Sequence, residues 1–152
     1  MGYRSDVSIV VAFDNLDNMK EVLAVYLLDP RVKDMNLMEY WETYQNVYGE
    51  KTVYYLKLYE QDWKWYDSYE DVQGLQRLYL LAMEFAENRK FAIAWKEVSI
   101  GEDGAIEADE GSSEEYSFLH EFCEDSLGYT NPEIIFDDTN SKEITIKLGE
   151  EK

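Results

Sequence analysis

Residues Ser8 to Phe13 form the run SIVVAF, which is almost continuously apolar and rich in β-branched side chains. Such a run is typical of a strand that is covered on both faces or lies centrally in a sheet. Asp14 follows it as the expected N-cap of a helix, because apolar residues then recur at helical spacing until Asp29-Pro30 ends the pattern. The chain is therefore predicted to open with a buried strand and an amphipathic helix.

Helical and strand patterns alternate after this opening. Leu37, Trp41, Tyr44 and Tyr48 are three or four residues apart and predict a second helix that ends near Gly49. Next come a predicted strand over 51–59, a long helix opened by a capping box of Ser68 and Asp71, and a hairpin of strands over 91–100 and 105–107. The last predicted elements are a fourth helix that begins at 111–115 and ends near Gly128, and strands over 133–136 and 143–148 joined as a second hairpin by the turn residues 137–141.

The mixture of hairpins and helices favours one fold class. The order strand, helix, helix, strand, helix, hairpin, helix, hairpin predicts an α+β fold with a largely antiparallel sheet and helices packed on one side, and not a doubly wound parallel fold. We expect the opening to be a split βαβ arrangement of the ferredoxin-like kind. A length of 152 residues without a long linker predicts a single domain over 1–152.

Composition indicates the cellular compartment of the protein and limits its cysteine chemistry. The apolar fraction of 45% is enough for a buried core. No segment approaches the roughly 18 consecutive apolar residues of a membrane span, and Met1 to Asp6 lacks the features of a signal peptide. We therefore expect a cytoplasmic protein. The single cysteine, Cys123, excludes an internal disulfide and a cysteine cluster for zinc.

Acidic residues are concentrated in the C-terminal third of the chain. The sequence holds 33 Asp and Glu against 14 Lys and Arg, a formal net charge of -19, and no Lys or Arg stands between Lys96 and Lys142. A field of this sign repels nucleic-acid phosphates and anionic lipid, and it attracts basic protein surfaces. The alternative is a solvated acidic face that only keeps the protein in solution. The acids predicted to bind a partner are Glu97, Glu102, Asp103, Glu107, Asp109, Glu110, Glu114 and Glu115.

Aromatic residues crowd the segment from Tyr40 to Tyr69. Trp63 and Trp65 stand in its most polar part, so we expect them to be exposed and to anchor a protein interface. Stacking of nucleic-acid bases is a competing use of such rings, but nucleic-acid grooves are electropositive and few lysines are interleaved with this segment. A third reading is that the rings simply pack the helices on the sheet.

No residue pattern in the chain supports catalysis. His120, Cys123 and Glu124 fall close together on a predicted helix, but zinc sites need three or four ligands and the chain has one histidine. Nearby carboxylates also raise the pKa of a thiol and suppress thiolate. The acidic pairs Glu114-Glu115 and Asp137-Asp138 do not match a calcium loop, and no phosphate-binding glycine motif is present. We predict no catalytic residue, no metal and no cofactor, and we expect that the protein is not an enzyme.

The opening residues Met1-Gly2-Tyr3-Arg4-Ser5-Asp6-Val7, which run directly into the apolar strand, resemble the start of small accessory proteins encoded by bacteriophages. This resemblance implies a place among small acidic phage proteins that inhibit host defence, including anti-CRISPR and anti-restriction proteins that imitate the negative surface of DNA. The similarity contains no motif with a known mechanism, so it implies no role for a particular residue.

Two non-enzymatic functions are compatible with these features, and an enzyme that uses His120, Cys123 or the acidic pairs is the third alternative. The first is a non-enzymatic acidic module, a phage inhibitor that blocks a basic nucleic-acid-binding surface of a host defence protein in the host cytoplasm, with Trp63 or Trp65 as an anchor. The second is a small-molecule or peptide-binding module in which the sheet and the aromatic segment form a pocket. Direct contact with nucleic acid or membrane is not expected. A homodimer through surplus aromatic rings is a further alternative, although the like charge of two copies opposes it.

Overall fold

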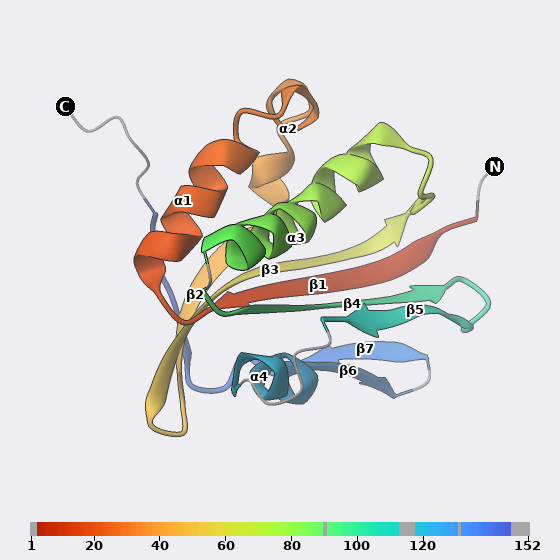
Figure 1. The fold of residues 1–152 in the computed structure, drawn as a ribbon. Coiled ribbons are helices and arrows are strands. Elements are labelled where there is room, and N and C mark those ends of the chain that lie inside the picture. Colours follow the sequence, from red (N-terminus) through yellow and green to blue (C-terminus); the bar gives the residue numbers. More distant parts are fainter. Residues whose placement is uncertain (1–2, 90, 113–117, 131, 147–152) are drawn as a thin grey trace.

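The computed structural model describes residues 3–89, 91–112, 118–130 and 132–146 (Figure 1). The elements in chain order are β1 (Ser5–Phe13), α1 (Leu16–Tyr26), α2 (Pro30–Asp34), the 3-10 helix η1 (Leu37–Tyr40), β2 (Glu42–Tyr48), β3 (Lys51–Trp63), α3 (Glu70–Arg89), β4 (Ile93–Gly101), β5 (Ile106–Gly111), α4 (Phe118–Ser126), β6 (Leu127–Thr130), β7 (Glu133–Phe136) and β8 (Ser141–Glu143). Within the described ranges, no helix combines the length and the apolar character needed to cross a membrane.

One antiparallel sheet organises these elements. Its strand order is β5-β4-β1-β3-β2-β8, and every neighbouring pair is antiparallel. β3 lies between β1 and β2, and β1 lies between β3 and β4, so the unit β1-α1-β2-β3-α3-β4 has the ferredoxin-like order 4-1-3-2. The α+β class, the antiparallel sheet and the split βαβ opening are therefore confirmed. β5 and β8 extend the four-strand unit at its two edges.

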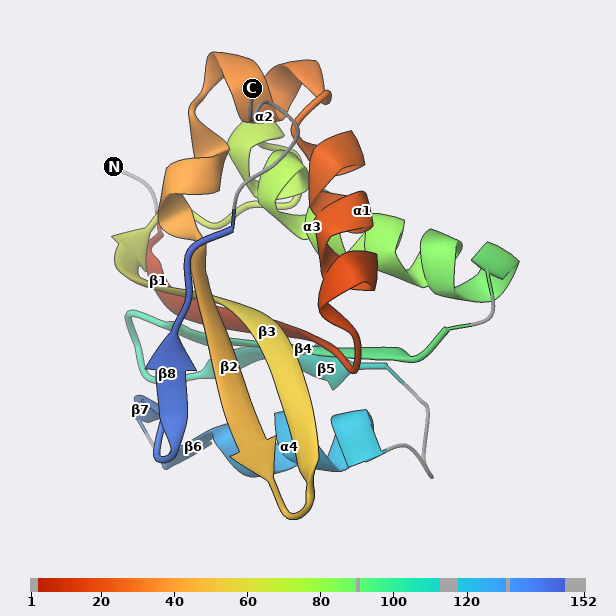
Figure 2. The same ribbon diagram turned by 90° about the vertical axis from the view of Figure 1, so that its left-hand side faces the viewer.

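The helices α1, α2 and α3 cover one face of this sheet (Figure 2). The side chains of β1 that face them are Val7, Ile9, Val11 and Phe13, which are fully buried. Two hydrogen bonds fix the elements of this helical layer to one another: the Tyr26 hydroxyl donates to Gly74 O of α3 at 2.9 Å, and the Trp41 indole donates to the Tyr26 hydroxyl at 3.1 Å. This layer contains the larger hydrophobic core.

A second, smaller layer covers the opposite face. It consists of α4 and the two-stranded sheet of β6 and β7, and Figure 1 shows these elements on the far side of the sheet from α1 and α3. Val10 and Ala12 of β1 face this layer and pack with Phe122 of α4. The run SIVVAF is thus buried on both faces, as predicted. Helices do not cover only one side, however, because α4 lies on the other.

The prediction of a helix over 37–48 is wrong. Only the single turn η1 is helical there, and β2 follows it. Tyr44 and Tyr48 are four apart, which suits a helix, but an even spacing also places both on one face of a strand, where they pack against the smaller core. Gly49 does not end a helix. It has a φ of 65° and is the first residue of the two-residue turn that joins β2 to β3, as in a type II′ turn.

Smaller predictions at element ends also need correction. The N-cap of α1 is Asn15 and not Asp14, since the Asn15 side chain accepts from the backbone of Asp17 and Asn18. Helix α3 begins at Glu70, so Ser68 does not cap it.

The predicted C-terminal hairpin also differs from the structure. β7 pairs with β6, and β8 ends at Glu143 and pairs with β2, so the strands at the two ends of the turn 137–141 are not partners. Gly128 lies within β6, because α4 already ends at Ser126.

Candidate binding surface

The turn and edge strand at 101–111, called the acidic hairpin below, hold five of the eight acids predicted to bind a partner. Gly101 N donates to Ala105 O at 2.8 Å, and Gly104, with a φ of 84°, completes the tight turn. β5 is an outermost strand that pairs with β4. The exposed acids of the acidic hairpin are Glu102, Asp103, Glu107, Asp109 and Glu110. The fold thus gathers these five predicted residues on one edge.

A β-bulge distributes the acids over both faces of this edge. The register of β4 and β5 shifts between Ser99 and Ile100, which leaves Glu107 as the additional residue. Asp109 is directed to the layer of β6 and β7, where its Oδ2 accepts a hydrogen bond from the Tyr129 hydroxyl at 3.1 Å. The other face of the hairpin is directed to the N-terminal residues and α3. Carboxylates therefore lie on both faces of the strand.

The N-terminal residues hold the acidic turn in place. The Tyr3 hydroxyl lies 2.5 Å from Asp103 Oδ1 and 3.1 Å from Glu107 Oε2, and Arg4 N donates to Glu102 Oε1 at 2.8 Å. The hydrogen bond from Tyr3 lowers the pKa of Asp103, whereas the two carboxylates raise the pKa of Tyr3. Sequence analysis missed this role of Tyr3 and Arg4, because nothing local links them to residues about a hundred positions away.

Glu97 is not part of the exposed surface, so its predicted role in direct docking is wrong. Its side chain is 3% exposed and lies between β4 and α3. Glu97 Oε1 accepts from the Tyr79 hydroxyl at 2.7 Å, Oε2 accepts from the Trp65 indole at 3.0 Å, and Gln76 Nε2 lies 3.3 Å from both oxygens. Burial raises the pKa of Glu97, and the nearby Glu110 adds to the rise, against the effect of the three donors.

The expected exposure of Trp63 and Trp65 is also wrong. Both rings are half-buried and pack against the larger core, with their centroids 5.6 Å apart in an edge-to-face contact. The Trp63 indole donates to Asp71 Oδ2 at 3.1 Å, and the Trp65 indole donates to Glu97. Their polar neighbours in sequence suggested solvent, but each indole N–H finds a carboxylate inside the fold. They support the surface from beneath and do not project from it.

A cavity of about 270 Å³ lies beside Glu97, between the acidic hairpin and the start of α3. Its lining combines carboxylates, aromatic rings and small polar groups: Tyr3, Ser5, Trp65, Tyr66, Asp67, Gln76, Glu97, Ser99, Glu107, Ala108 and Glu110. The Tyr66 hydroxyl accepts from Tyr3 N at 2.6 Å, which ties the N-terminal segment to the cavity wall. Trp65 and Glu97, which sequence analysis selected separately, meet here.

The remaining sequence candidates do not assemble into a site. Glu114 and Glu115 lie outside the described residues. Cys123 is 1% exposed, and burial raises the pKa of its thiol, while Glu124 binds Lys96 Nζ at 3.1 Å. Among the residues that the structure describes, no group of three or more His, Cys, Asp or Glu side chains is placed to hold a metal ion.

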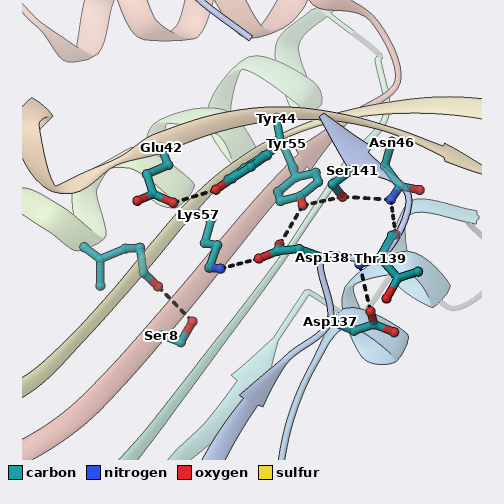
Figure 3. Close-up of polar contacts among 11 residues, drawn as sticks. Ser8, Glu42, Tyr44, Asn46, Tyr55, Lys57, Asp137, Asp138, Thr139 and Ser141 are labelled. Carbon is teal, nitrogen blue, oxygen red and sulfur yellow. Dashed lines mark hydrogen bonds and ion pairs between the residues drawn. The ribbon is translucent and has the colours of Figure 1, made fainter. Parts of the chain in front are cut away.

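Asp138, which the sequence presented as a turn residue and as part of an acidic pair without calcium-loop spacing, belongs to a polar network (Figure 3). Its Oδ2 lies 2.6 Å from Lys57 Nζ, and its Oδ1 accepts from the Tyr55 hydroxyl at 3.0 Å. The Tyr55 hydroxyl also lies 2.7 Å from Ser141 Oγ, and Lys57 Nζ is 4.4 Å from the centroid of the Phe136 ring. These contacts fasten the loop before β8, and Ser141 of β8 itself, to β3. The network is structural and lies at the opposite edge of the sheet from the acidic hairpin.

Comparison of the chain with protein-family models, with curated proteins and with solved structures found no match.

Proposed function

We propose that the protein is a non-enzymatic binding module whose acidic hairpin docks on a basic surface of a partner protein. The observation that carries this proposal is the edge strand β5 with its turn, because every acid in residues 101–111 is exposed and none of these residues is Lys or Arg. The nearest preceding base, Lys96, is 6% exposed and lies 3.1 Å from Glu124 and 2.7 Å from Leu127 O, so its charge is already used inside the fold.

The position of the acids on an edge strand supports a protein partner. An edge strand offers backbone groups that another chain can pair with, and charged side chains are a known means of blocking unwanted pairing. Two copies of β5 would bring like charges together, which opposes self-association. A partner segment rich in Lys and Arg would be attracted to β5, because its complementary charge raises the association rate and the specificity of binding.

The partner class follows from the charge and from the resemblance of the N-terminal residues. The negative field of the acidic hairpin attracts basic surfaces, and such surfaces are characteristic of nucleic-acid-binding proteins. The resemblance of Met1 to Val7 to phage accessory proteins makes a host defence protein the proposed target, with anti-CRISPR or anti-restriction activity by imitation of DNA. The proposed place of action is then the host cytoplasm.

Charge reversal on the acidic hairpin tests the proposal. A triple variant Glu102→Lys, Asp109→Lys, Glu110→Lys changes exposed side chains only. In capture from bacterial lysate we expect the native chain to retain a basic protein that added duplex DNA displaces, and we expect the triple variant to lose it.

A matched control carries the same change of net charge elsewhere. Its substitutions are Asp34→Lys, Glu50→Lys and Glu87→Lys, which are exposed on α2, on the β2–β3 turn and on α3. We expect this control to retain the partner at about 0.1 M salt, where the Debye length is about 10 Å. Equal loss in both variants would show that only net charge matters, and retention by both would remove the hairpin from the interface.

The cavity beside Glu97 favours a second candidate function, the binding of a small molecule or peptide. A ligand that binds only the native state raises its thermal stability by mass action. For this candidate the rise would be similar at low and high salt, whereas docking on a basic surface weakens as salt increases. A metabolite screen by thermal shift at two salt concentrations separates the two candidates.

A further inference from the structure

The cavity beside Glu97 has a chemical character that the acidic hairpin alone does not have. Its lining includes the carboxylates of Asp67, Glu97, Glu107 and Glu110, and no Lys, Arg or His is among the described residues that line it. Its volume of about 270 Å³ lies just below the roughly 300–1,000 Å³ of pockets that hold drug-sized molecules. The cavity therefore suits one side chain of a partner better than a whole cofactor.

Glu97 places a buried carboxyl group at the cavity wall, and no basic side chain of the described residues is paired with it. Its hydrogen-bond donors are the neutral groups of Tyr79, Trp65 and Gln76. In the described part of the chain, no ion pair within 4.0 Å involves Glu97. A buried carboxylate without a cation is costly, and an entering cation that also donates hydrogen bonds to it offsets part of this cost. Burial raises the pKa of Glu97, which is the sign expected for a carboxylate that lacks a cation.

Aromatic rings make up the other part of the wall. Tyr3, Trp65 and Tyr66 line the cavity together with the acids. Cations are attracted to the faces of such rings. A guanidinium group combines both requirements, because it is planar, stacks on aromatic faces and donates hydrogen bonds to carboxylates in a fork. An ammonium group is more strongly hydrated and lacks this shape.

We infer that this cavity binds the guanidinium group of an arginine side chain that the basic partner presents. The inference rests on the proposed function, since the partner supplies the arginine. Glu107 and Glu110 lie on the edge strand itself, so an arginine from a segment docked on the acidic hairpin reaches the cavity from the same side. Glu97 provides the charge at the inner wall, and Trp65 links the aromatic wall to that charge.

The probe for the test is N-acetyl-arginine amide, with the citrulline analogue as its neutral equivalent and the lysine analogue as a second cation. Binding is followed by the indole N–H signals in NMR, because the Trp65 indole donates directly to Glu97. We expect a saturable shift of the Trp65 signal with the arginine probe alone. The Trp41 indole donates to the buried Tyr26 hydroxyl and serves as the internal reference that does not shift.

Two double variants with the same change of charge show whether the cavity is responsible. Glu107→Gln with Glu110→Gln removes two lining carboxylates, and we expect the dissociation constant of the probe to rise about fivefold, as for partly exposed charge pairs. Glu102→Gln with Asp109→Asn changes two exposed acids of the same hairpin outside the lining, and we expect it to leave the constant unchanged. These substitutions leave the buried Glu97 in place.

Defined results would overturn the inference. Equal shifts with the arginine and citrulline probes would exclude a charge-dependent site, equal binding of the lysine probe would exclude guanidinium selectivity, and equal weakening in both double variants would exclude the cavity. Failure here with successful capture in the charge-reversal experiment would refute only the arginine site. Binding of the probe without any captured partner would instead refute the proposed function.

Discussion

Gly111 ends the edge strand that carries the acids, and its substitution by alanine tests how tightly β5 packs on β4. A Cβ atom at Gly111 would lie 2.6 Å from Trp95 O and 3.4 Å from Lys96 Cα. Both neighbours are backbone atoms of β4, so no side-chain rotation relieves the contact. Reaching even 3.0 Å from Trp95 O needs a displacement of 3.0 − 2.6 = 0.4 Å.

The displacement acts on a hydrogen bond at the same point. Ser112 N donates to Trp95 O at 2.9 Å, and the Ser112 hydroxyl accepts from Trp95 N at 3.1 Å. Overpacking of this kind costs about 1–3 kcal/mol, and the lower chain entropy of alanine in the unfolded state returns about 0.4–1 kcal/mol. We expect Gly111→Ala to lower the free energy of unfolding by about 1–2 kcal/mol.

Urea denaturation measures this change, with Gly128→Ala as the matched control. Gly128 also lies in a strand, and a Cβ atom there would meet nothing within 4 Å. We expect the control to be as stable as the native chain or more stable by up to about 1 kcal/mol. A Gly111→Ala variant that matches the Gly128→Ala variant would refute the close approach of β5 to β4, and with it the fixed position of the acidic hairpin.

Two further predictions concern one buried and one half-buried carboxyl group. The raised pKa of Glu97, ordinarily 4.5, means that above about pH 4.5 the native state binds more protons than the unfolded state, so stability falls as pH rises through the native pKa. Glu97→Gln should lack this loss. In urea titrations from pH 4.5 to 8, the free energy of unfolding of the variant should therefore rise relative to that of the native chain. A difference between the two that does not change with pH would contradict the burial of Glu97. Asp138→Asn removes the charge 2.6 Å from Lys57 Nζ and should cost about 1–2 kcal/mol. The control is Asp137→Asn at the exposed neighbouring position, which should change the free energy of unfolding by no more than about 0.5 kcal/mol. Equal losses of stability in the two variants would refute the Lys57 contact.

The elements that sequence patterns predict correctly are those whose signal is local. The run SIVVAF needs no partner to be recognised as a buried strand, and the turn at 101–104 predicts its own hairpin. The segment 37–48 fails because residues spaced by four satisfy both a helix and one face of a strand. The pairing of β8 with β2 joins residues about a hundred positions apart, and no local pattern specifies such a contact.

The candidate site divides in the same way. The exposed acids of the hairpin were predicted, because charge density is visible in the sequence and a hairpin edge leaves it in solvent. Glu97 was wrongly grouped with them. It stands among apolar residues of β4, but its environment depends on α3, whose contribution of Tyr79 and Gln76 cannot be derived from β4 alone. The cavity is formed by residues of both β4 and α3, together with the N-terminal Tyr3.

Lys96 and Glu97 together show why the cavity, and not the charge as such, is the distinctive feature of the molecule. They are consecutive in β4, so their side chains point to opposite faces, and both are buried. Lys96 finds an anion and a helix C-terminus within the chain, at Glu124 Oε1 and Leu127 O. Glu97 finds only neutral donors, next to an open volume lined by more carboxylates. The fold satisfies one buried charge completely and leaves the other facing a space, and an ionised Glu97 obtains a cation only from outside the described chain.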